Sequence, residues 1–384
     1  DKLQKPPAQK QNVAGMLGNG LLTNDGEDWR RQRKLAQPAF HMNRISSYAD
    51  TMVDYTVGTV ESWRDQTEVE AHEAMLQLTM EIVAKTLFDA EVSDDADDIS
   101  HAITAAMHLA EKMIARPLRA RLWKIDYPGN THLAQRRASQ AVVDRTIYRF
   151  IEDRRQSGEN KGDLLSMLMR AEYEDGSRMS DKQLRDEAIT LFIAGHETTA
   201  NALTWALYLL ATHPHVYDKA VQVVDAAVGS RRATMADMGA LDYIKWIVQE
   251  TMRLYPPAWI FSRQVKAPLT VHGYDVKPGA VVAISPYVIH RDPRYWDNPT
   301  VFSPERFATH GDKLKDGYLP FGGGPRVCIG NSFAMMEMVL VLTTLLQHYR
   351  FELAPGQDVQ AMPSVTLRPA DGMRLRLDQR EVAV

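Results

Sequence analysis

Apolar positions recur with a helical period along most of the chain. This spacing of three to four residues predicts amphipathic helices at about 27–38, 44–66, 72–88, 97–116, 131–156, 163–173, 181–213, 214–228, 241–255 and 329–348. Strand patterns are confined to the last third, at 265–285 and in the tail from Phe351 onward, where β-branched residues flank Gly and Pro-Gly turns. The chain is therefore expected to be mainly α with small β-sheets.

The longest predicted helix, 181–213, is interrupted by a polar segment at its middle. Ser180 and Gln183 have the spacing of a capping box before it, and Pro214 ends it. The segment AGHETTAN, residues 194–201, brings a glycine, which weakens a helix, and two threonines, whose hydroxyls can bond to carbonyls one turn earlier. We expect a local opening that holds a polar group; a loosely packed helix with a solvated Glu-Thr-Thr face is the alternative.

Composition and charge are those of an ordinary globular protein. The chain has 384 residues, is 45% hydrophobic and 24% charged, and carries a net charge of −4, with no bias toward nucleic acid or membrane surfaces. No linker, repeat or low-complexity tract divides it, so a single domain over 1–384 is expected. No apolar run approaches the roughly 20 residues of a membrane span, and the start lacks a signal-peptide pattern.

A single cysteine excludes a disulfide framework and any metal site built from several thiolates. A reducing, cytoplasmic location is the corresponding expectation.

Two segments combine charges that can meet in the core. In QETMRLYPP, Glu250 and Arg253 lie at i,i+3 on one helix face, and Arg306 in NPTVFSPERF is a second cation that could converge on Glu250. A buried Arg–Glu–Arg cluster costs desolvation energy, so it indicates positioning more than stability. The alternative is a surface pair, which contributes only ~0.2–0.5 kcal/mol.

Cys328 lies in FGGGPRVCIG, residues 321–330, directly before a predicted helix. Three glycines from Gly322 on allow backbone conformations closed to other residues and let the chain lie against a flat object. A thiolate at a helix start is stabilised by backbone N–H groups and the helix dipole, which suits a metal ligand. Arg326 could bind a carboxylate of the same ligand. The alternative for a lone cysteine is a small buried apolar residue.

Taken in chain order, WRRQR, AGHETT, ETMR, PERF and FGGGPRVCIG resemble the heme-thiolate monooxygenases, the cytochrome P-450 (P450) family. The resemblance runs from Gly20 to about the end. It implies the cytochrome P450 fold, a large helical domain with small β-sheets, and heme b (iron protoporphyrin IX) with Cys328 as axial iron ligand. The family's cysteine signature is filled by Phe321, Gly324, Arg326, Cys328 and Gly330.

The resemblance also implies roles outside the signature. Trp29 and Arg33, one turn apart, match the helix that binds the heme propionates, and Arg326 and Arg263 match further propionate partners, since arginine pairs carboxylates bidentately. The remaining residues expected at the heme are Ala194, Gly195, Phe321, Gly322 and Gly330. Glu250, Arg253 and Arg306 match the triad that locks the core beneath the heme.

On the distal side, Glu197 and Thr198 match the family's acid–alcohol pair, which delivers protons to dioxygen while bulk water is excluded. Glu197 is expected to connect to solvent, Thr198 to face oxygen, and Thr199 to pack or to bond to the backbone. A hydrophobic small-molecule substrate is expected, with apolar contacts from Met107, Met113, Phe192, Ala258, Trp259, Ile260 and Met362.

The chain shows no flavin or dinucleotide fingerprint, so a separate electron donor is implied. Arg30, Arg31 and Lys34 lie where the family docks its donors, and an acidic ferredoxin or flavodoxin-type partner fits them; a solvated basic face is the alternative. Three histidines, His41, His196 and His290, are not at metal-ligand spacing and receive no role.

The implied enzyme is a monooxygenase that activates dioxygen with two external electrons and hydroxylates its substrate. The alternatives are a peroxide-using or non-oxygenating heme-thiolate enzyme, and a heme-binding sensor without turnover. Only 28 residues precede Trp29, whereas family members normally carry more chain there. The helix and strand region that opens the family fold is therefore expected to be missing.

Overall fold

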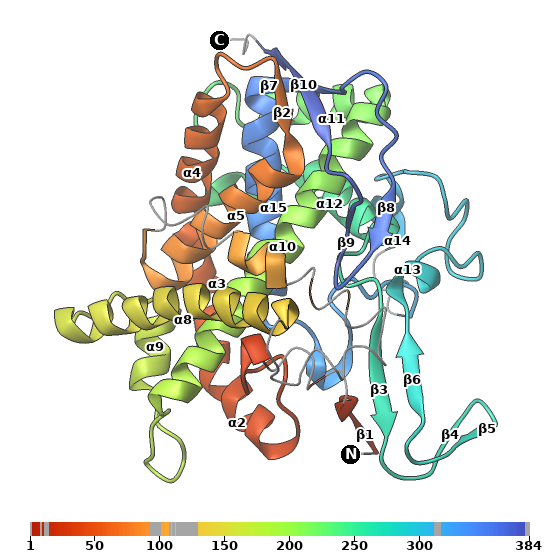
Figure 1. Ribbon diagram of the computed structural model, residues 1–384. Coiled ribbons are helices and arrows are strands. Elements are labelled where there is room, and N and C mark those ends of the chain that lie inside the picture. The colour runs from red at the N-terminus through yellow and green to blue at the C-terminus, as the bar shows by residue number, and fades with distance from the viewer. Residues whose placement is uncertain are drawn as a thin grey trace. The chain divides into compact units, whose positions relative to one another are not determined.

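The computed structural model describes residues 2–7, 10, 15–91, 101–106, 109, 112, 130–310 and 316–380, and these are mainly helical (Figure 1). They divide into two compact units. The first unit comprises Asp1–Ala39, Val83–Ala194 and Phe261–Ile284, and the second comprises Phe40–Ile82, Gly195–Ile260 and Ser285–Val384. That the chain forms a single domain stays a prediction.

The first unit combines helices with two small antiparallel sheets. Its helices are α2 (Gly26–Ala36), α8 (Thr131–Ser157), α9 (Leu164–Arg170), the end of α5 (Ala71–Phe88) and the first half of α10 (Asp181–Thr212). One sheet has the order β1-β3-β6 (Leu3–Gln4, Phe261–Val265, Val281–Ile284), and β4 (Leu269–Val271) pairs with β5 (Tyr274–Val276). In its core the Phe88 ring packs on Phe150 and Phe192, with centroid distances of 6.0 and 5.9 Å.

The second unit is built around α15 (Asn331–His348), which is buried along most of its length. Among the helices that pack against α15 are α4 (Ala49–Ser62), α11 (Pro214–Ala227) and α12 (Asp242–Leu254) (Figure 1). The chain leaves α15 directly into β7 (Tyr349–Leu353), which pairs antiparallel with β10 (Arg374–Gln379), and β10 pairs with β2 (Glu68–Glu70). A hairpin joins β8 (Ala361–Pro363) to β9 (Leu367–Pro369).

Short elements complete the second unit. They are α3 (Met42–Ile45), α13 (Pro286–Ile289), α14 (Arg306–His310) and the 3₁₀ turns Gln37–Phe40 (shared with the first unit), Ser46–Tyr48, Met235–Gly239 and Gly324–Arg326. Over the described residues, no helix combines the length and the apolar character needed to cross a bilayer.

The helical period predicted most helix ends within two residues. Two predicted helices differ from the structure, and a third can be compared only in part. The predicted helix 44–66 is divided into α3, a 3₁₀ turn and α4. At this break the Ser46 hydroxyl donates to the Met42 carbonyl and the Ser47 hydroxyl to the Arg44 carbonyl. Such bonds bend a helix, but equivalent bonds of Thr56 and Thr59 lie inside the continuous helix α4. The predicted helix 163–173 ends earlier, at Arg170.

The predicted helix 97–116 can be compared only in part. Residues 101–106 are helical, and most of its remainder, including the expected substrate contacts Met107 and Met113, lies outside the described residues.

Helix α10 begins where the capping pattern predicts it, although only half of the capping box forms. The Gln183 N–H donates to Ser180 Oγ at 3.2 Å, while the Gln183 side chain donates to the Asn19 carbonyl and to Glu187 Oε1. The helix continues through residues 194–201 and ends before Pro214, the first residue of α11. The expected opening of α10 at this segment stays a prediction.

Candidate functional site

The loop that carries Cys328 is closed by its own backbone. The Cys328 N–H donates to the Phe321 carbonyl at 2.9 Å, and the Gly322 N–H donates to the Leu319 carbonyl at 3.1 Å. Gly322 and Gly324 have φ angles of 72° and 66°, in the left-handed region that glycine adopts without strain. A Cβ atom at either glycine would meet no atom within 4 Å, so this side of the loop leaves room for a flat ligand.

Cys328 itself is exposed, although the helix that follows is buried. Gly330 is the N-cap of α15, so the Cys328 side chain stands at the helix start, where N–H groups and the helix dipole stabilise a thiolate. A single thiolate suits an iron atom that a porphyrin already holds by four nitrogen atoms. The residues present therefore fit a heme.

The Glu250–Arg253–Arg306 cluster forms as its spacing predicts. Arg253 donates to Glu250 through Nε at 2.7 Å and Nη2 at 2.8 Å, and Arg306 Nε donates to Glu250 Oε1 at 2.9 Å. Glu250 and Arg253 are fully buried, and the Arg306 side chain is only 8% exposed. The Arg253 guanidinium also lies 5.1 Å from the Trp296 ring centroid. The cluster is thus a desolvated ion-pair network, not a surface pair.

Exposure along α10 marks one face of the predicted distal segment. From Leu184 to Leu210 every residue is buried except Ala194, Gly195, Thr198 and Tyr208. Positions 194, 195 and 198 stand at i, i+1 and i+4, so they share one helix face. The residues expected to leave room over the iron, together with the expected hydroxyl, therefore form an accessible stripe on an otherwise buried helix.

Glu197 is held by a hydrogen-bond network that the sequence did not reveal. The Thr366 hydroxyl donates to Glu197 Oε1 at 2.6 Å, and Asn201 Nδ2 donates to Thr366 Oγ1 at 3.2 Å. His72 Nε2 lies 3.1 Å from Asn201 Oδ1, and burial lowers the pKa of His72 to about 4. His72 is therefore neutral at pH 7 and donates through Nε2.

Sequence reasoning also missed a buried acid on α15. Glu337 is fully buried, burial raises its pKa well above the usual value, and the nearby Thr199 hydroxyl opposes this rise. Neither carboxyl oxygen reaches hydrogen-bonding geometry with any described residue. Burial therefore favours the protonated, uncharged form of the Glu337 carboxyl group. An acidic residue inside the apolar run MMEMVLVL was the signal that could have found it.

The expected heme contacts are divided between the two units. Trp29 and Arg33 (in α2), Ala194 and Arg263 (in β3) belong to the first unit. The second unit contains Gly195, Glu197, Thr198, Phe321, Gly322, Arg326, Cys328 and Gly330. That the first set meets the cysteine loop stays a prediction.

Among the expected substrate contacts, Phe192 is 1% exposed and belongs to the apolar core, whereas Ile260 is 40% exposed.

The basic residues of α2 are paired within the first unit. Arg30 pairs with Glu27, Arg31 with Asp175 and Lys34 with Glu174, at 3.1, 3.1 and 2.7 Å. All three pairs are exposed. The face is thus a mixed-charge surface in this structure and not a uniformly basic patch.

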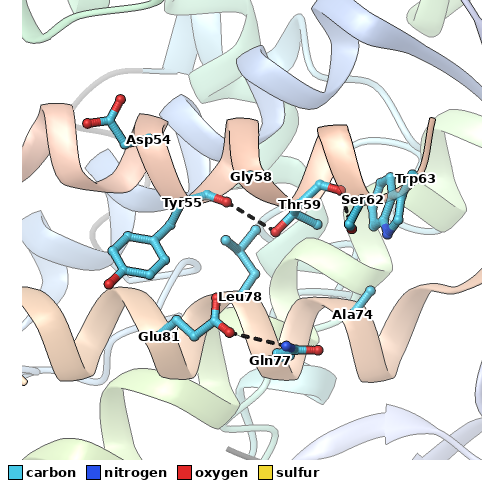
Figure 2. Close-up of a pocket in the computed structure, with 10 residues that line it drawn as sticks. All are labelled: Asp54, Tyr55, Gly58, Thr59, Ser62, Trp63, Ala74, Gln77, Leu78 and Glu81. Atoms are coloured by element: carbon cyan, nitrogen blue, oxygen red, sulfur yellow. Dashed lines mark hydrogen bonds between the residues drawn. The ribbon is translucent and has the colours of Figure 1, made fainter. Parts of the chain in front are cut away.

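A separate hollow of about 460 Å³ lies between α4 and α5 (Figure 2). Its lining includes the acids Asp54 and Glu81 together with Trp63 and Leu78. It contains none of the residues expected at the heme or on the distal side, so it is not the candidate site.

Comparisons with known proteins show the family of this chain. The model of the family Cytochrome P450 matches residues 4–375. Cyclooctatin synthase from Streptomyces melanosporofaciens is 36% identical over 363 residues, which cover 93% of this chain and 78% of that protein. Cyclooctat-9-en-7-ol 5-monooxygenase from the same organism is 33% identical over 347 residues, 89% and 74% of the two chains.

Human cytochrome P450 4V2 is 30% identical over 390 residues, which cover 95% of this chain and 74% of the human protein. Because the family match extends over almost the entire sequence, the protein belongs to the cytochrome P450 family and is a monooxygenase, an oxidoreductase.

Proposed function

We propose that the protein is a heme-thiolate monooxygenase that hydroxylates a hydrophobic small molecule, using dioxygen and two electrons from a separate donor protein. Family membership implies the heme, the dioxygen and the redox partner. The observation that carries the proposal is the loop of Phe321–Gly330, which presents an exposed Cys328 thiol at the start of a buried helix.

In this proposal Cys328 binds the heme iron, and the loop fixes the direction of the sulfur atom. Bound heme supplies an iron centre that accepts electrons and activates dioxygen, and a thiolate ligand favours O–O cleavage. The hydrogen bond from the Cys328 N–H to the Phe321 carbonyl holds the residue that carries the sulfur. Gly322 and Gly324 carry no Cβ atom, so a bound heme would meet no side chain at these two positions.

Glu197 and Thr198 handle protons on the distal side. The Thr366 hydroxyl fixes the orientation of the Glu197 carboxyl group, so Glu197 can hold and release a proton at a constant position. Thr198 is partly accessible on the stripe it shares with Ala194 and Gly195, which supports a hydroxyl that faces the reactants. A fixed acid beside a positioned alcohol delivers protons without admitting bulk water.

The substrate class is a hydrocarbon-rich small molecule. The name of one relative, cyclooctat-9-en-7-ol 5-monooxygenase, supports a mostly hydrocarbon alcohol of this kind. The exposed Ile260 and the half-buried Trp259 supply apolar surface in the second unit, and the Trp259 indole N–H donates to the Ser364 carbonyl at 2.8 Å.

The electron donor is an acidic protein of the ferredoxin or flavodoxin type. Exposed ion pairs contribute only about 0–1 kcal/mol. The acidic side chains of such a donor can therefore replace Asp175 and Glu174 as partners of Arg31 and Lys34 at little energetic cost.

The test combines spectroscopy with turnover in a reconstituted system. The reduced, carbon monoxide-bound protein is expected to show a thiolate-type Soret band, and Cys328→Ser is expected to abolish that band while leaving the protein folded. Thr198→Ala is expected to retain the band and to divert electrons from product to hydrogen peroxide. Thr212→Ala, the same change at the end of α10, is the matched control.

Each alternative has its own outcome. Turnover with peroxide that is faster than turnover with reductant and dioxygen would favour the peroxide-using enzyme. A thiolate-type band without any turnover would favour the sensor. A folded, heme-loaded protein that lacks the thiolate-type band would refute the proposal.

A further inference from the structure

The segment that leads into the cysteine loop is anchored at three consecutive residues. Trp296 Nε1 donates to the Gly317 carbonyl at 2.9 Å, and the Tyr318 hydroxyl donates to the Gln249 carbonyl at 2.9 Å. The Leu319 N–H donates to His290 Nε2 at 2.7 Å. These bonds fix the chain two residues before Phe321, where the loop begins.

The protonation of His290 follows from its two contacts. Because Nε2 accepts the Leu319 N–H, it carries no proton, and the proton of the neutral ring is on Nδ1. Nδ1 lies 3.2 Å from the Arg253 carbonyl and donates to it. Burial lowers the pKa of His290 to about 4; hydrogen bonding to the backbone of Arg253 and Met252 opposes this shift, and the charges of Arg253 and Arg291 add to it. The side chain is fully buried, and both ring nitrogens are used.

His290 and Arg253 bind each other in both directions. Arg253 Nη1 donates to the His290 carbonyl at 2.8 Å, while the His290 ring donates to the Arg253 carbonyl. Arg253 is in turn held by Glu250. An unbroken series of hydrogen bonds therefore runs from the buried ion-pair cluster through His290 to Leu319, and all of these residues belong to the second unit.

From Leu319 the series continues to the cysteine. The Leu319 carbonyl accepts the Gly322 N–H at 3.1 Å, which makes the first turn of the loop, and the Phe321 carbonyl accepts the Cys328 N–H. A shift of the Leu319 amide would therefore move the turn on which the Cys328 backbone depends.

We infer that His290 is a positioning residue for the Cys328 thiolate, which transmits the fixed geometry of the Glu250–Arg253–Arg306 cluster to the cysteine loop through the Leu319 amide. This inference rests on the proposed role of Cys328 as the heme ligand. A histidine kept only for packing needs no directional bond, whereas here each ring nitrogen binds a backbone group of a different segment.

The experiment uses the heme-loaded protein and three variants. His290→Phe keeps an aromatic ring of similar size and removes both hydrogen bonds. His290→Gln keeps an acceptor and a donor on one side chain and serves as the rescue. Thr251→Ala removes another buried hydrogen bond of α12, from Thr251 Oγ1 to the Ile247 carbonyl, and controls for a general loss of stability.

Two readouts report on positioning. Hydrogen exchange at the Leu319 amide is expected to accelerate at least about tenfold in His290→Phe, because a buried N–H loses its acceptor, and to stay near the original rate in the other two variants. The thiolate-type carbon monoxide band is expected to convert several-fold faster to the form without thiolate in His290→Phe, and His290→Gln is expected to restore most of its lifetime.

The inference is overturned if His290→Phe retains both the Leu319 protection and the lifetime of the band, or if Thr251→Ala shortens that lifetime equally at the same thermal stability. Should His290→Phe not accumulate, His290→Asn replaces it, since its side chain is polar but too short to reach Leu319. Absence of the band in the unaltered protein would instead refute the proposed function, while the Leu319 exchange would still report on the anchor.

Discussion

The buried ion-pair cluster offers the sharpest prediction, because one carboxylate there serves two cations. Glu250 Oε1 accepts from Arg253 Nη2, from Arg306 Nε and from the Ser303 N–H at 3.0 Å, while Oε2 accepts from Arg253 Nε. The change Glu250→Gln preserves the size of the side chain but removes the negative charge. It also places an NH₂ group beside the guanidinium N–H groups, so at least one former hydrogen bond becomes a repulsive contact between two donors.

The magnitude follows from burial. Removing one partner of a buried ion pair costs about 3–5 kcal/mol, because an uncompensated buried charge remains. With an unfolding entropy of about 2.1 cal/mol/K per residue, the 384-residue chain has an entropy of about 0.8 kcal/mol/K. Glu250→Gln is therefore expected to lower the thermal midpoint of the heme-loaded protein by about 4–6 °C.

An exposed pair of the same chemistry supplies the control. Arg350 and Asp218 lie 3.1 Å apart with side chains 40% and 56% exposed, and such pairs contribute about 0–1 kcal/mol. Asp218→Asn should thus shift the midpoint by about 1 °C or less. Calorimetry or circular dichroism measures both variants under one condition. Equal shifts in the two variants would refute the argument that burial makes the Glu250 charge indispensable.

Three further predictions concern the polar groups of the second unit. Thr366→Val removes the hydroxyl that holds Glu197, so less product and more peroxide should form per electron pair. Thr366→Ser keeps a hydroxyl and should restore the coupling of electrons to product. Unchanged coupling in Thr366→Val would contradict the role of Thr366. Glu337→Met removes a buried carboxyl without a hydrogen-bond partner among the described residues and should raise stability to urea by about 1–3 kcal/mol; a loss would reveal a bound partner such as buried water. The pKa of His290 is about 4 in the folded protein and 6.5 in the unfolded chain. The contribution of neutral His290 to the free energy of unfolding is therefore complete above pH 6.5 and decreases on acidification, by about 2 kcal/mol at pH 5. His290→Gln should lose less stability than the unaltered protein between pH 7 and 5, and parallel pH profiles would rule this out.

Local patterns predicted the features that depend on neighbours in sequence. The period of α15 and α10 is set by residues within a turn or two of each other, and both helices were placed within two residues of their ends. The i,i+3 pair of Glu250 and Arg253 is equally local. The glycines before Cys328 predicted an unusual backbone conformation, and Gly322 and Gly324 have the positive φ angles that favour glycine.

Contacts between segments far apart in the sequence could not be predicted, because they have no local sequence pattern. Thr366 reaches Glu197 across 169 residues, and neither residue differs locally from an ordinary threonine or glutamate. His290 was set aside because it lacks metal-ligand spacing, yet its partners are backbone groups of Arg253 and Leu319. Backbone groups are present at every position, so sequence spacing cannot identify a histidine that binds them.

The backbone contacts of Arg253 and Arg306 explain why the charged cluster persists despite its desolvation cost. Replacing a buried ion-pair cluster by well-packed apolar residues is often neutral or stabilising, but that result holds only where the arginines bind nothing else. Here Arg253 also donates to the carbonyls of His290, Pro299 and Val301, and Arg306 donates to those of Asp297 and Val301. From 290 to 301 the chain contains no helix or strand, so secondary structure does not satisfy these carbonyls.

A carbonyl group that loses its donor is most unfavourable where water cannot replace that donor, and among these residues this applies above all to His290, which is fully buried. The two arginines therefore replace the hydrogen bonds that regular structure would have provided, and Glu250 makes this possible by neutralising part of their charge. Replacing all three charged residues with apolar ones would remove the buried charges but would leave these carbonyl groups without hydrogen-bond donors. The cluster therefore supplies the hydrogen-bond donors of the irregular segment 290–301. His290 is the first residue of that segment, and through the Leu319 amide it holds the loop of Cys328 in place.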